Sequence, residues 1–517
     1  MYTLHLKVAI VINLLTSLRC ARILAIFPGP AISHQIVFRP ITQELARRGH
    51  EVVVITPNPA FSGQQAPENL IEIDIGNASY AVWDKVVFND ATSKNRDVVP
   101  DVSFLTRTLF KVFEAAMETP AVKEIIRKKE HYDLLLTEHG MEVSLGFSHI
   151  FKAPVIQISS LGHLFFSDKS VGSDIHPFLY PCPMNQRVYN LTKFEKIQTI
   201  WNGLKLISAF KVLNRETDVI IKKIFGQDTP SFNELKENIH MTMLNVHPIW
   251  IDNQPLSPNV ILIGGIHEKL PTPLPQDLQE HLDSSKNGTI YVSFGSKATL
   301  SNFTPETVKI LLEVLCNLPF DVLLRWEEDK LPADCTNIRV SKWFPQADVL
   351  RHPRVKLFIT QGGLQSTDEA ISGGVPLIGI PIMGDQYYNS EKYVRHGIGK
   401  KLDWYDFEAR TFRDAIEEII NNVSYHDSII RLRTLMKDSL HSPLERAVWW
   451  AEYVLRHGAR HLAPPTAHIT LYEYLEIDLL IYIILWLIMS VGVIVITVYI
   501  VVKYIRRRLG RKKEKLF

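Results

Sequence analysis

The chain has 517 residues, and its 57 Lys and Arg nearly balance its 55 Asp and Glu. This length favours two domains with accessory segments, and the net charge of +2 argues against a nucleic-acid partner. Of the four cysteines, Cys20 falls in an expected leader, so Cys182, Cys316 and Cys335 allow at most one disulfide, whose pairing the sequence leaves open.

The first 20 residues have the pattern of a signal peptide. Lys7 precedes an apolar run from Val8 to Leu15, and small and polar residues follow. The run is too short for a membrane span and suits the apolar region of a signal peptide. We therefore predict a signal peptide over residues 1–20.

Strand and helix signals alternate from residue 21 to residue 250. An apolar strand at Ile23–Phe27, a helix that runs towards Arg48 and a strand at Glu51–Thr56 form a βαβ unit. Such a unit implies a parallel sheet with a right-handed crossover. Further apolar strands are expected at 133–137 and 154–159. We predict a doubly wound, Rossmann-like α/β domain over residues 21–250.

A second α/β domain is expected over residues 258–440. It opens with a strand at Thr289–Phe294, a helix at Thr304–Leu318 and a strand at Phe320–Trp326. The expected architecture is therefore two doubly wound domains that face each other across a cleft.

The most informative segment of the chain is the block from Lys342 to Asn389. It contains an apolar strand, the pair Gly362-Gly363, a helix at Leu364–Ser372 and a strand at Val375–Ile380. A glycine turn between a strand and a helix presents backbone N–H groups and a positive helix end to an anion. This pattern suits a nucleotide diphosphate.

The C-terminal region has the pattern of a membrane anchor. Residues 441–476 form helices and a linker, and residues 477–502 are predicted to span a membrane. Leu479–Val502 carries no charge, and about 24 residues at about 1.5 Å each exceed a hydrocarbon core of about 30 Å. Residues 503–517 form a basic tail, which the positive-inside rule places in the cytosol. We expect a single-pass type I protein with lumenal domains.

The last five residues resemble a retrieval signal for the endoplasmic reticulum. Lys513 and Lys515 stand fifth and third from the C-terminus, as in dilysine-type signals. The alternative is that they only extend the basic cluster. Lumenal exposure would make the N-glycosylation sequons usable. These sequons begin at Asn77, Asn190, Asn287, Asn302 and Asn422.

The 342–389 block resembles the signature of the UDP-dependent glycosyltransferases of glycosyltransferase family 1, which include the vertebrate UDP-glucuronosyltransferases. We expect an insect-type member. The matching residues are Trp343, Pro345, Gln346, Gly362, Gly363, Glu369, Ala370, Pro376, Pro381, Asp385, Gln386 and Asn389. Gln361 departs from the pattern, because the family usually has His before the glycine pair. The resemblance covers nearly the whole mature chain and implies the GT-B fold.

The resemblance also implies a catalytic base, His34, in the context Pro28…Ser33-His34. Imidazole has an ordinary pKa near 6.5, so it can accept a proton at neutral pH. The family's orienting Asp corresponds here to Glu138, and Asp133 is the fallback. The alternatives are that His34 is only a hydrogen-bond partner at a helix start and that Glu138 is a solvated carboxylate.

The donor site follows from the same resemblance. Trp343 would stack on the base, Gln346 would lie beside uracil and ribose, and Glu369 would accept from the ribose hydroxyls. The remaining UDP-sugar residues are Gly362, Gly363 and Ser366 for the pyrophosphate, Ser296 and Gln361 beside it, and Asp385 and Gln386 for the sugar hydroxyls.

The function that these resemblances imply is inverting transfer of a hexose from a UDP-sugar to a hydroxyl of a small lipophilic acceptor, as in detoxification. No metal or other cofactor is expected, and either a homo- or a hetero-oligomer stays open. UDP-glucose is preferred to UDP-glucuronate because Trp250–Pro255 contains no Lys or Arg. The alternatives are a non-catalytic nucleotide-sugar binder and an NAD-dependent oxidoreductase, which would need a G-x-G-x-x-G motif that the chain lacks.

Overall fold

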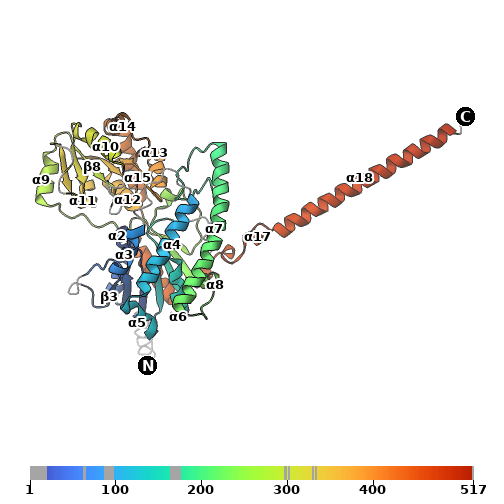
Figure 1. Cartoon of the computed structure of the whole chain (residues 1–517), viewed down its shortest axis with the longest axis horizontal. Helices are drawn as coiled ribbons and strands as arrows, with labels where there is room; N and C mark the ends of the chain where they lie inside the picture. Colours follow the sequence, from blue (N-terminus) through green and yellow to red (C-terminus); the bar gives the residue numbers. More distant parts are fainter. Residues whose placement is uncertain are drawn as a thin grey trace, which may run out of the picture. The chain divides into compact units, whose positions relative to one another are not determined.

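The computed structural model describes residues 20–61, 66–86, 98–162, 176–295, 300, 303–328, 331 and 335–514. The predicted signal peptide, apart from Cys20, lies outside these residues, as do Ser296 and Asn302. The chain forms two compact units, Met1–Ala463 and Pro464–Phe517. The first unit contains two lobes, each built on its own parallel sheet (Figure 1).

The sheet of the N-terminal lobe has seven parallel strands in the order β3-β2-β1-β4-β5-β6-β7. The strands are β1 (Arg22–Ile26), β2 (Glu51–Thr56), β3 (Leu70–Asp74), β4 (Leu134–Glu138), β5 (Val155–Ser159), β6 (Ile239–Leu244) and β7 (Val260–Leu262). The central strands β4 and β5 are buried along their whole length, because helices cover both faces. The strand order reverses between β1 and β4, and in open α/β sheets ligands bind at such a reversal.

Helices and short 3-10 turns connect these strands. They are α2 (Ile32–Arg47), α3 (Gly76–Val86), α4 (Val98–Met117), α5 (Pro120–Lys128), η1 (Glu142–Leu145), α6 (Gly146–Phe151), α7 (Lys193–Phe225), α8 (Phe232–Leu235), η3 (Lys236–Asn238) and η4 (Pro248–Ile251). Helix α2 follows β1 directly, so its first turn lies at the carboxyl edge of the sheet.

The C-terminal lobe has six parallel strands in the order β10-β9-β8-β11-β12-β13. The strands are β8 (Thr289–Ser293), β9 (Asp321–Arg325), β10 (Ile338–Ser341), β11 (Val355–Thr360), β12 (Leu377–Gly379) and β13 (Gly399–Lys401). The helices are α9 (Gln276–Ser284), α10 (Pro305–Cys316), α11 (Gln346–Arg351), α12 (Leu364–Gly373), α13 (Gln386–Arg395), α14 (Ala409–Asn421) and α15 (Val423–Lys437). Here the order reverses between β8 and β11. The expected pair of doubly wound lobes is confirmed.

The boundary between the two lobes lies after β7 in the sequence. Strand β7 pairs with β6 of the first sheet, with Thr242 opposite Val260. The sequence predicts a second domain over residues 258–440, but parallel pairing with β6 assigns Val260–Leu262 to the sheet of the first lobe. A disulfide joins Cys316, at the end of α10, to Cys335, which settles the pairing that the sequence left open.

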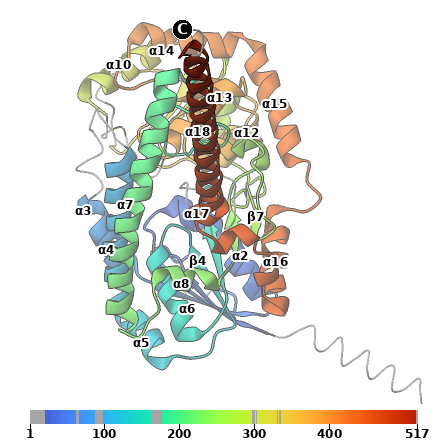
Figure 2. The ribbon, with the colours of Figure 1, turned by 90° about the vertical axis from the view of Figure 1, so that its right-hand side faces the viewer.

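Helix α16 (Pro443–His457) returns from the second lobe and packs beside α2 of the first (Figure 2). Its inner face consists of Ala447, Val448, Ala451 and Val454, all of which belong to the core around β1 and α2. Small residues on this face allow the two helices to approach closely. The short 3-10 turn η6 (Arg460–Leu462) ends the first unit.

The second unit contains η7 (Pro465–His468), α17 (Leu471–Tyr474) and the long helix α18 (Ile477–Glu514). Among the described residues, Ile477–Leu509 is the helical segment that is long and apolar enough to cross a membrane. The helix continues through part of the basic tail, beyond the predicted span of 477–502. Four of the predicted sequon asparagines, at 77, 190, 287 and 422, are exposed.

Replacing Ala451 by Asp tests the return of α16. Ala451 is fully buried, so a carboxylate there would lose its hydration without gaining a partner. We expect Ala451→Asp to lower the free energy of unfolding by about 3 kcal/mol or more, measured by urea denaturation. Arg456→Ala, on the exposed side of the same helix, is the control and should change it by less than about 1 kcal/mol. Equal effects of the two variants would contradict this packing.

Candidate active site

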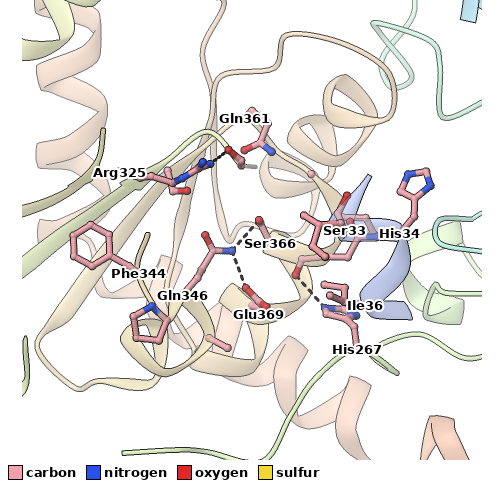
Figure 3. Close-up of a pocket in the computed structure, with 18 of the residues that line it drawn as sticks. Ser33, His34, Ile36, His267, Arg325, Phe344, Gln346, Gln361, Ser366 and Glu369 are labelled. Carbon is pink, nitrogen blue, oxygen red and sulfur yellow. Dashed lines mark hydrogen bonds between the residues drawn. The ribbon is translucent and has the colours of Figure 1, made fainter. Parts of the chain in front are cut away.

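The carboxyl edges of the two sheets border one cavity of about 580 Å³. The N-terminal lobe contributes the start of α2, and the C-terminal lobe contributes the turns after β8, β11 and β12. Figure 3 shows His34 on one side of this cavity and Gln346, Gln361, Ser366 and Glu369 on the other. Residues of both lobes are therefore available to one ligand.

His34 is hydrogen bonded to a carboxylate. Its Nδ1 lies 2.8 Å from Oε1 of Glu138, the last residue of β4. The other carboxylate oxygen, Oε2, accepts the backbone N–H of Gly29 at 3.0 Å. Glu138 is 5% exposed, whereas the His34 side chain keeps 33% of its surface accessible. The carboxylate is thus fixed from two sides, and the imidazole remains open to the cavity.

Gly29 is required by this close approach. A Cβ atom at residue 29 would lie 2.6 Å from Oε1 of Glu138, well inside van der Waals contact. Asp133, the fallback partner, does not approach His34. It accepts the backbone N–H of Arg22 at 2.8 Å and contacts His131 at the opposite end of the strand. Glu138 is therefore the carboxylate that the fold brings to His34.

The turn between β11 and α12 lines the part of the cavity that belongs to the C-terminal lobe. Gly362 has φ of +90°, and a Cβ there would lie 2.7 Å from the Ser390 hydroxyl. Gly363 is the N-cap of α12 and Ser366 lies in its first turn, so the positive end of the helix faces the cavity. The Leu364 N–H of this turn is directed to the Asp385 carboxylate. This is the predicted anion cradle.

Gln346 and Glu369 form a polar pair beside this cradle. Gln346 Nε2 donates to Glu369 Oε2 at 2.7 Å and to Ser366 Oγ at 2.9 Å (Figure 3). Tyr291 donates its hydroxyl to Gln346 Oε1 at 3.2 Å. Burial raises the pKa of Glu369 to about 7, and the hydrogen bond from Gln346 only partly opposes this shift. Trp343 lines the same end of the cavity and is 65% exposed, so its ring face is accessible.

Asp385 and Gln386 begin helix α13 at the cavity wall. Asn389 Nδ2 donates to Asp385 Oδ2 at 2.8 Å and to the Gly362 carbonyl at 2.8 Å. Burial raises the pKa of Asp385 to about 6, while this hydrogen bond and the nearby His34 lower it. Gln386 Oε1 accepts two backbone N–H groups of the preceding loop, so its amide nitrogen is oriented by the loop.

Gln361, which replaces the family's usual His, lies between the two glycine turns. Thr360 donates its hydroxyl to Gln361 Oε1 at 2.9 Å. Its Nε2 lies so close to Gly295 that a Cβ there would be 2.3 Å away. The amide therefore presents a donor beside the cradle. Ser296, predicted to add a hydroxyl next to Gly295, lies outside the described residues.

Arg325 lines the cavity and was not predicted. It ends strand β9, donates to the Gly295 carbonyl and to the Lys342 carbonyl, and lies 5.8 Å from the Trp343 ring centre (Figure 3). These contacts fix the turn after β8 and the approach to Trp343. The signal was available, because a charged residue at the carboxyl end of an apolar strand is a frequent site residue in parallel sheets.

Direct contacts hold the two lobes together behind the cavity. The buried Trp250 donates its indole N–H to Asn389 Oδ1 at 2.8 Å and accepts the Tyr388 hydroxyl on its backbone carbonyl. Asp252 pairs with the fully buried Lys392 at 2.8 Å. Asn389 and Lys392 on α13 lie within two turns of Asp385, so the connection between β6 and β7 in the first lobe positions that wall.

The described residues contain no group of three or more His, Cys, Asp or Glu side chains that could hold a metal ion. Absence of a metal cofactor stays a prediction, because nothing in the site tests it. The polar groups around the cradle are amide, hydroxyl and carboxyl groups at hydrogen-bonding distance from one another.

Comparisons with known proteins agree with this geometry. A family model described as UDP-glucoronosyl and UDP-glucosyl transferase matches residues 23–515. The ecdysteroid UDP-glucosyltransferase of Spodoptera littoralis nuclear polyhedrosis virus is 34% identical over 493 residues, which cover 91% of this chain and 95% of that protein. UDP-glucosyltransferase 2 of Dactylopius coccus is 33% identical over 466 residues, 89% of each chain.

Solved structures show the same fold at low sequence identity. The calicheamicin glycosyltransferase CalG4 superposes with a TM-score of 0.57 at 17% identity, covering 85% of this chain and all of that one. The spinosyn forosaminyltransferase SpnP gives a TM-score of 0.58 at 17% identity, with 85% of this chain and 100% of that chain covered.

Two Rossmann-like lobes with one cavity at their carboxyl edges form the GT-B fold. The family match over nearly the whole chain is more specific. The chain belongs to the UDP-glucuronosyl and UDP-glucosyl transferase family and is a UDP-glycosyltransferase.

The raised pKa of Glu369 predicts a pH-dependent stability of the ligand-free protein. Its folded-state pKa of about 7 exceeds the ordinary 4.5, so the stabilising proton is bound at pH 4.5 and is lost as the pH rises through 7. The stability of the wild type relative to Glu369→Gln should therefore fall by up to about 3 kcal/mol between pH 4.5 and 7. Urea unfolding at several pH values measures it, and parallel curves for the two proteins would contradict the shift.

Proposed function

We propose that the protein transfers a hexose from a UDP-sugar to a hydroxyl of a small lipophilic acceptor, with inversion, and that His34 is the base. The observation that carries this proposal is that His34, held by Glu138, lines the same cavity as the α12 cradle. A base and an anion site on one cavity are the two parts that such a transfer needs.

The base would act through its free nitrogen. With Glu138 accepting from Nδ1–H, the lone pair of Nε2 can take the proton of the acceptor hydroxyl. The tautomer is inferred from this hydrogen bond. Glu138 then stabilises the imidazolium, as the carboxylate of a serine-protease triad does. The Gly29 N–H keeps the second carboxylate oxygen in place throughout.

The reaction is a single in-line displacement. The acceptor oxygen forms a bond to the anomeric carbon while the bond from that carbon to the diphosphate oxygen breaks, so UDP leaves with the electron pair. The hydroxyl proton moves to His34. The Gly363–Ser366 end of α12 and the Gln361 amide would stabilise the charge on the departing diphosphate.

The predicted donor contacts fit the same pose. Trp343 offers an exposed ring face for the uracil, while Gln346 and Glu369 offer an amide and a carboxyl group for the ribose. Asp385 and Gln386, on the wall towards His34, would bind the sugar hydroxyls. These roles are the ones that the family resemblance implies, and the position and chemical type of each residue agree with them.

UDP-glucose is the proposed donor, with UDP-glucuronate as the competing one. The absence of Lys and Arg from 250–255 does not bear on the choice of donor, because the described lining of the cavity does not include those residues. They pack instead against α13. The support comes from relatives named UDP-glucosyltransferases. We further propose that the chain is a single-pass type I protein of the endoplasmic reticulum, with conjugation of foreign or steroid-like alcohols as its role.

Substitution of His34 and Glu138 tests the reaction. His34→Ala should lower kcat by about 100- to 10,000-fold, because the acceptor hydroxyl loses its base. Glu138→Gln should lower kcat less, since the imidazole keeps a hydrogen-bond partner but loses the charge that stabilises it. UDP-glucose and UDP-glucuronate are supplied separately with a panel of phenols and steroid alcohols, and product is measured by mass spectrometry.

The matched control is His131→Ala, because this exposed histidine also contacts a carboxylate but lies away from the cavity. It should retain wild-type activity. UDP affinity, measured by calorimetry, should be unchanged in all three variants. Wild type that binds UDP-sugar but forms no glycoside with any acceptor would favour the non-catalytic binder, and full activity of His34→Ala would refute the assigned base.

A further inference from the structure

Helix α7 has an apolar face that is exposed. Large apolar side chains in its N-terminal half keep between 42% and 75% of their surface accessible, and these are Phe194, Ile197, Ile200, Trp201, Leu204 and Ile207. At about 100° per residue, they lie within an arc of about 140°. Contiguous apolar surface of this kind on a folded unit marks an interaction site.

This face is not the one that packs against the lobe. Helix α7 runs beside α4 along the first lobe (Figure 2). Its buried Leu206 and Leu213 lie on the opposite side of the helix, and Leu213 belongs to the same core as Phe113 of α4. An ion pair of 2.8 Å between Arg107 and Glu216 also joins the two helices. The core contacts of α7 are thus made without the exposed face.

Lysines border the exposed face. By helical periodicity Lys196 and Lys205 fall at its two edges, while Lys193 and Lys211 stand at its two ends. All four lysines are exposed. The acidic residue of the segment 193–212 is Glu195, which belongs to the capping box on the opposite side of the helix. The face is therefore apolar at its centre and positive around its border.

This pattern is complementary to the surface of a lipid bilayer. An interfacial helix directs Trp, Phe and Leu side chains to the acyl chains. Its lysines lay their apolar stems along the same surface and carry their ammonium groups to the phosphates of the lipids. A second copy of the chain suits the face less well, because it would bring two lysine borders together.

The chain itself holds this face near a membrane. Residues 464–476 connect the first unit to helix α18, which carries the predicted membrane span. About 13 residues at about 3.5 Å each reach at most about 45 Å. Once α18 spans a bilayer, the first unit therefore stays within this reach of its surface. A tether of this length turns a weak second contact into an intramolecular one.

We propose that the exposed face of α7 over residues 193–212 is a second membrane contact, which lies in the headgroup region of the bilayer that α18 spans. This inference rests on the proposed membrane anchor and not on the proposed reaction. It fixes one side of the first unit at the bilayer surface, instead of leaving that unit free on its tether.

A fluorescent label tests this contact in the full-length protein. Ile197→Cys carries an environment-sensitive label on the face, and Leu435→Cys carries the same label at an exposed position of α15 as the control. Cys20 is replaced by Ser in both proteins, and Cys182 is buried, so it does not react. Both proteins are reconstituted in vesicles of phosphatidylcholine and phosphatidylserine.

Lipids that carry a spin label report the depth of each position. A spin label near the headgroup should quench the label at 197 at least about threefold more strongly than the label at 435. A spin label at the end of the acyl chain should quench it less, because an interfacial helix lies only about 5–10 Å deep.

Two further variants test which side chains make the contact. Replacing Trp201 and Leu204 by Ser should reduce the headgroup-level quenching at 197 by at least about half, because the apolar centre of the face is lost. Val219→Ser removes an exposed apolar residue from the same helix outside the face, so it should leave the quenching unchanged.

The outcomes separate this proposal from its alternatives. Equal quenching at 197 and 435 would overturn it. Energy transfer between copies labelled at 197, without quenching by lipid, would also overturn it and assign the face to a second copy. Release of the protein from the vesicles by carbonate would contradict the anchor and this inference with it. Turnover does not enter the measurement, so failure of the proposed reaction and failure of the contact are seen separately.

Discussion

A hydrogen bond between His34 and the buried Glu138 is the contact on which the site depends. It joins the helix that follows β1 to the end of β4, and these strands are neighbours in the sheet at the point where strand order reverses. A parallel α/β sheet brings the carboxyl ends of two such strands together. The fold itself therefore supplies a carboxylate to the histidine, and Gly29 leaves the space that this carboxylate occupies.

The second lobe also places its part of the site where strand order reverses, but with different side chains. Its own reversal lies between β8 and β11, where Gly295, Gln361 and the start of α12 meet. A cavity between two such edges needs the lobes to stay apposed. Trp250 and Asp252, in the connection between β6 and β7, provide this through Asn389 and Lys392, while α16 returns to the first lobe. Burial lowers the pKa of Lys392 to about 8, although Asp252 opposes that shift, so the cost of this buried pair is appreciable.

Much of this arrangement could be predicted from the sequence, because strand and helix periodicity and the fixed spacing of the 342–389 block are local signals. His34 and Glu138 came from the family resemblance. His34 and Gly363 of the glycine turn line one cavity, and Glu138 is hydrogen bonded to His34. Pairing across the sheet was not predictable in the same way. The assignment of β7 to the first sheet depends on contacts with β6, and the packing of Trp250 depends on α13, far along the chain.

The central claim is that one acceptor hydroxyl and one diphosphate meet in the cavity between the lobes. A structure of the enzyme with UDP and a glycosylated product tests it most directly. The claim predicts that the uracil stacks on Trp343, that the β-phosphate lies at the N-terminus of α12, and that the glycosidic oxygen lies within about 3 Å of His34 Nε2. A diphosphate bound away from α12, or a glycosidic oxygen out of reach of His34 in the closed complex, would contradict the account.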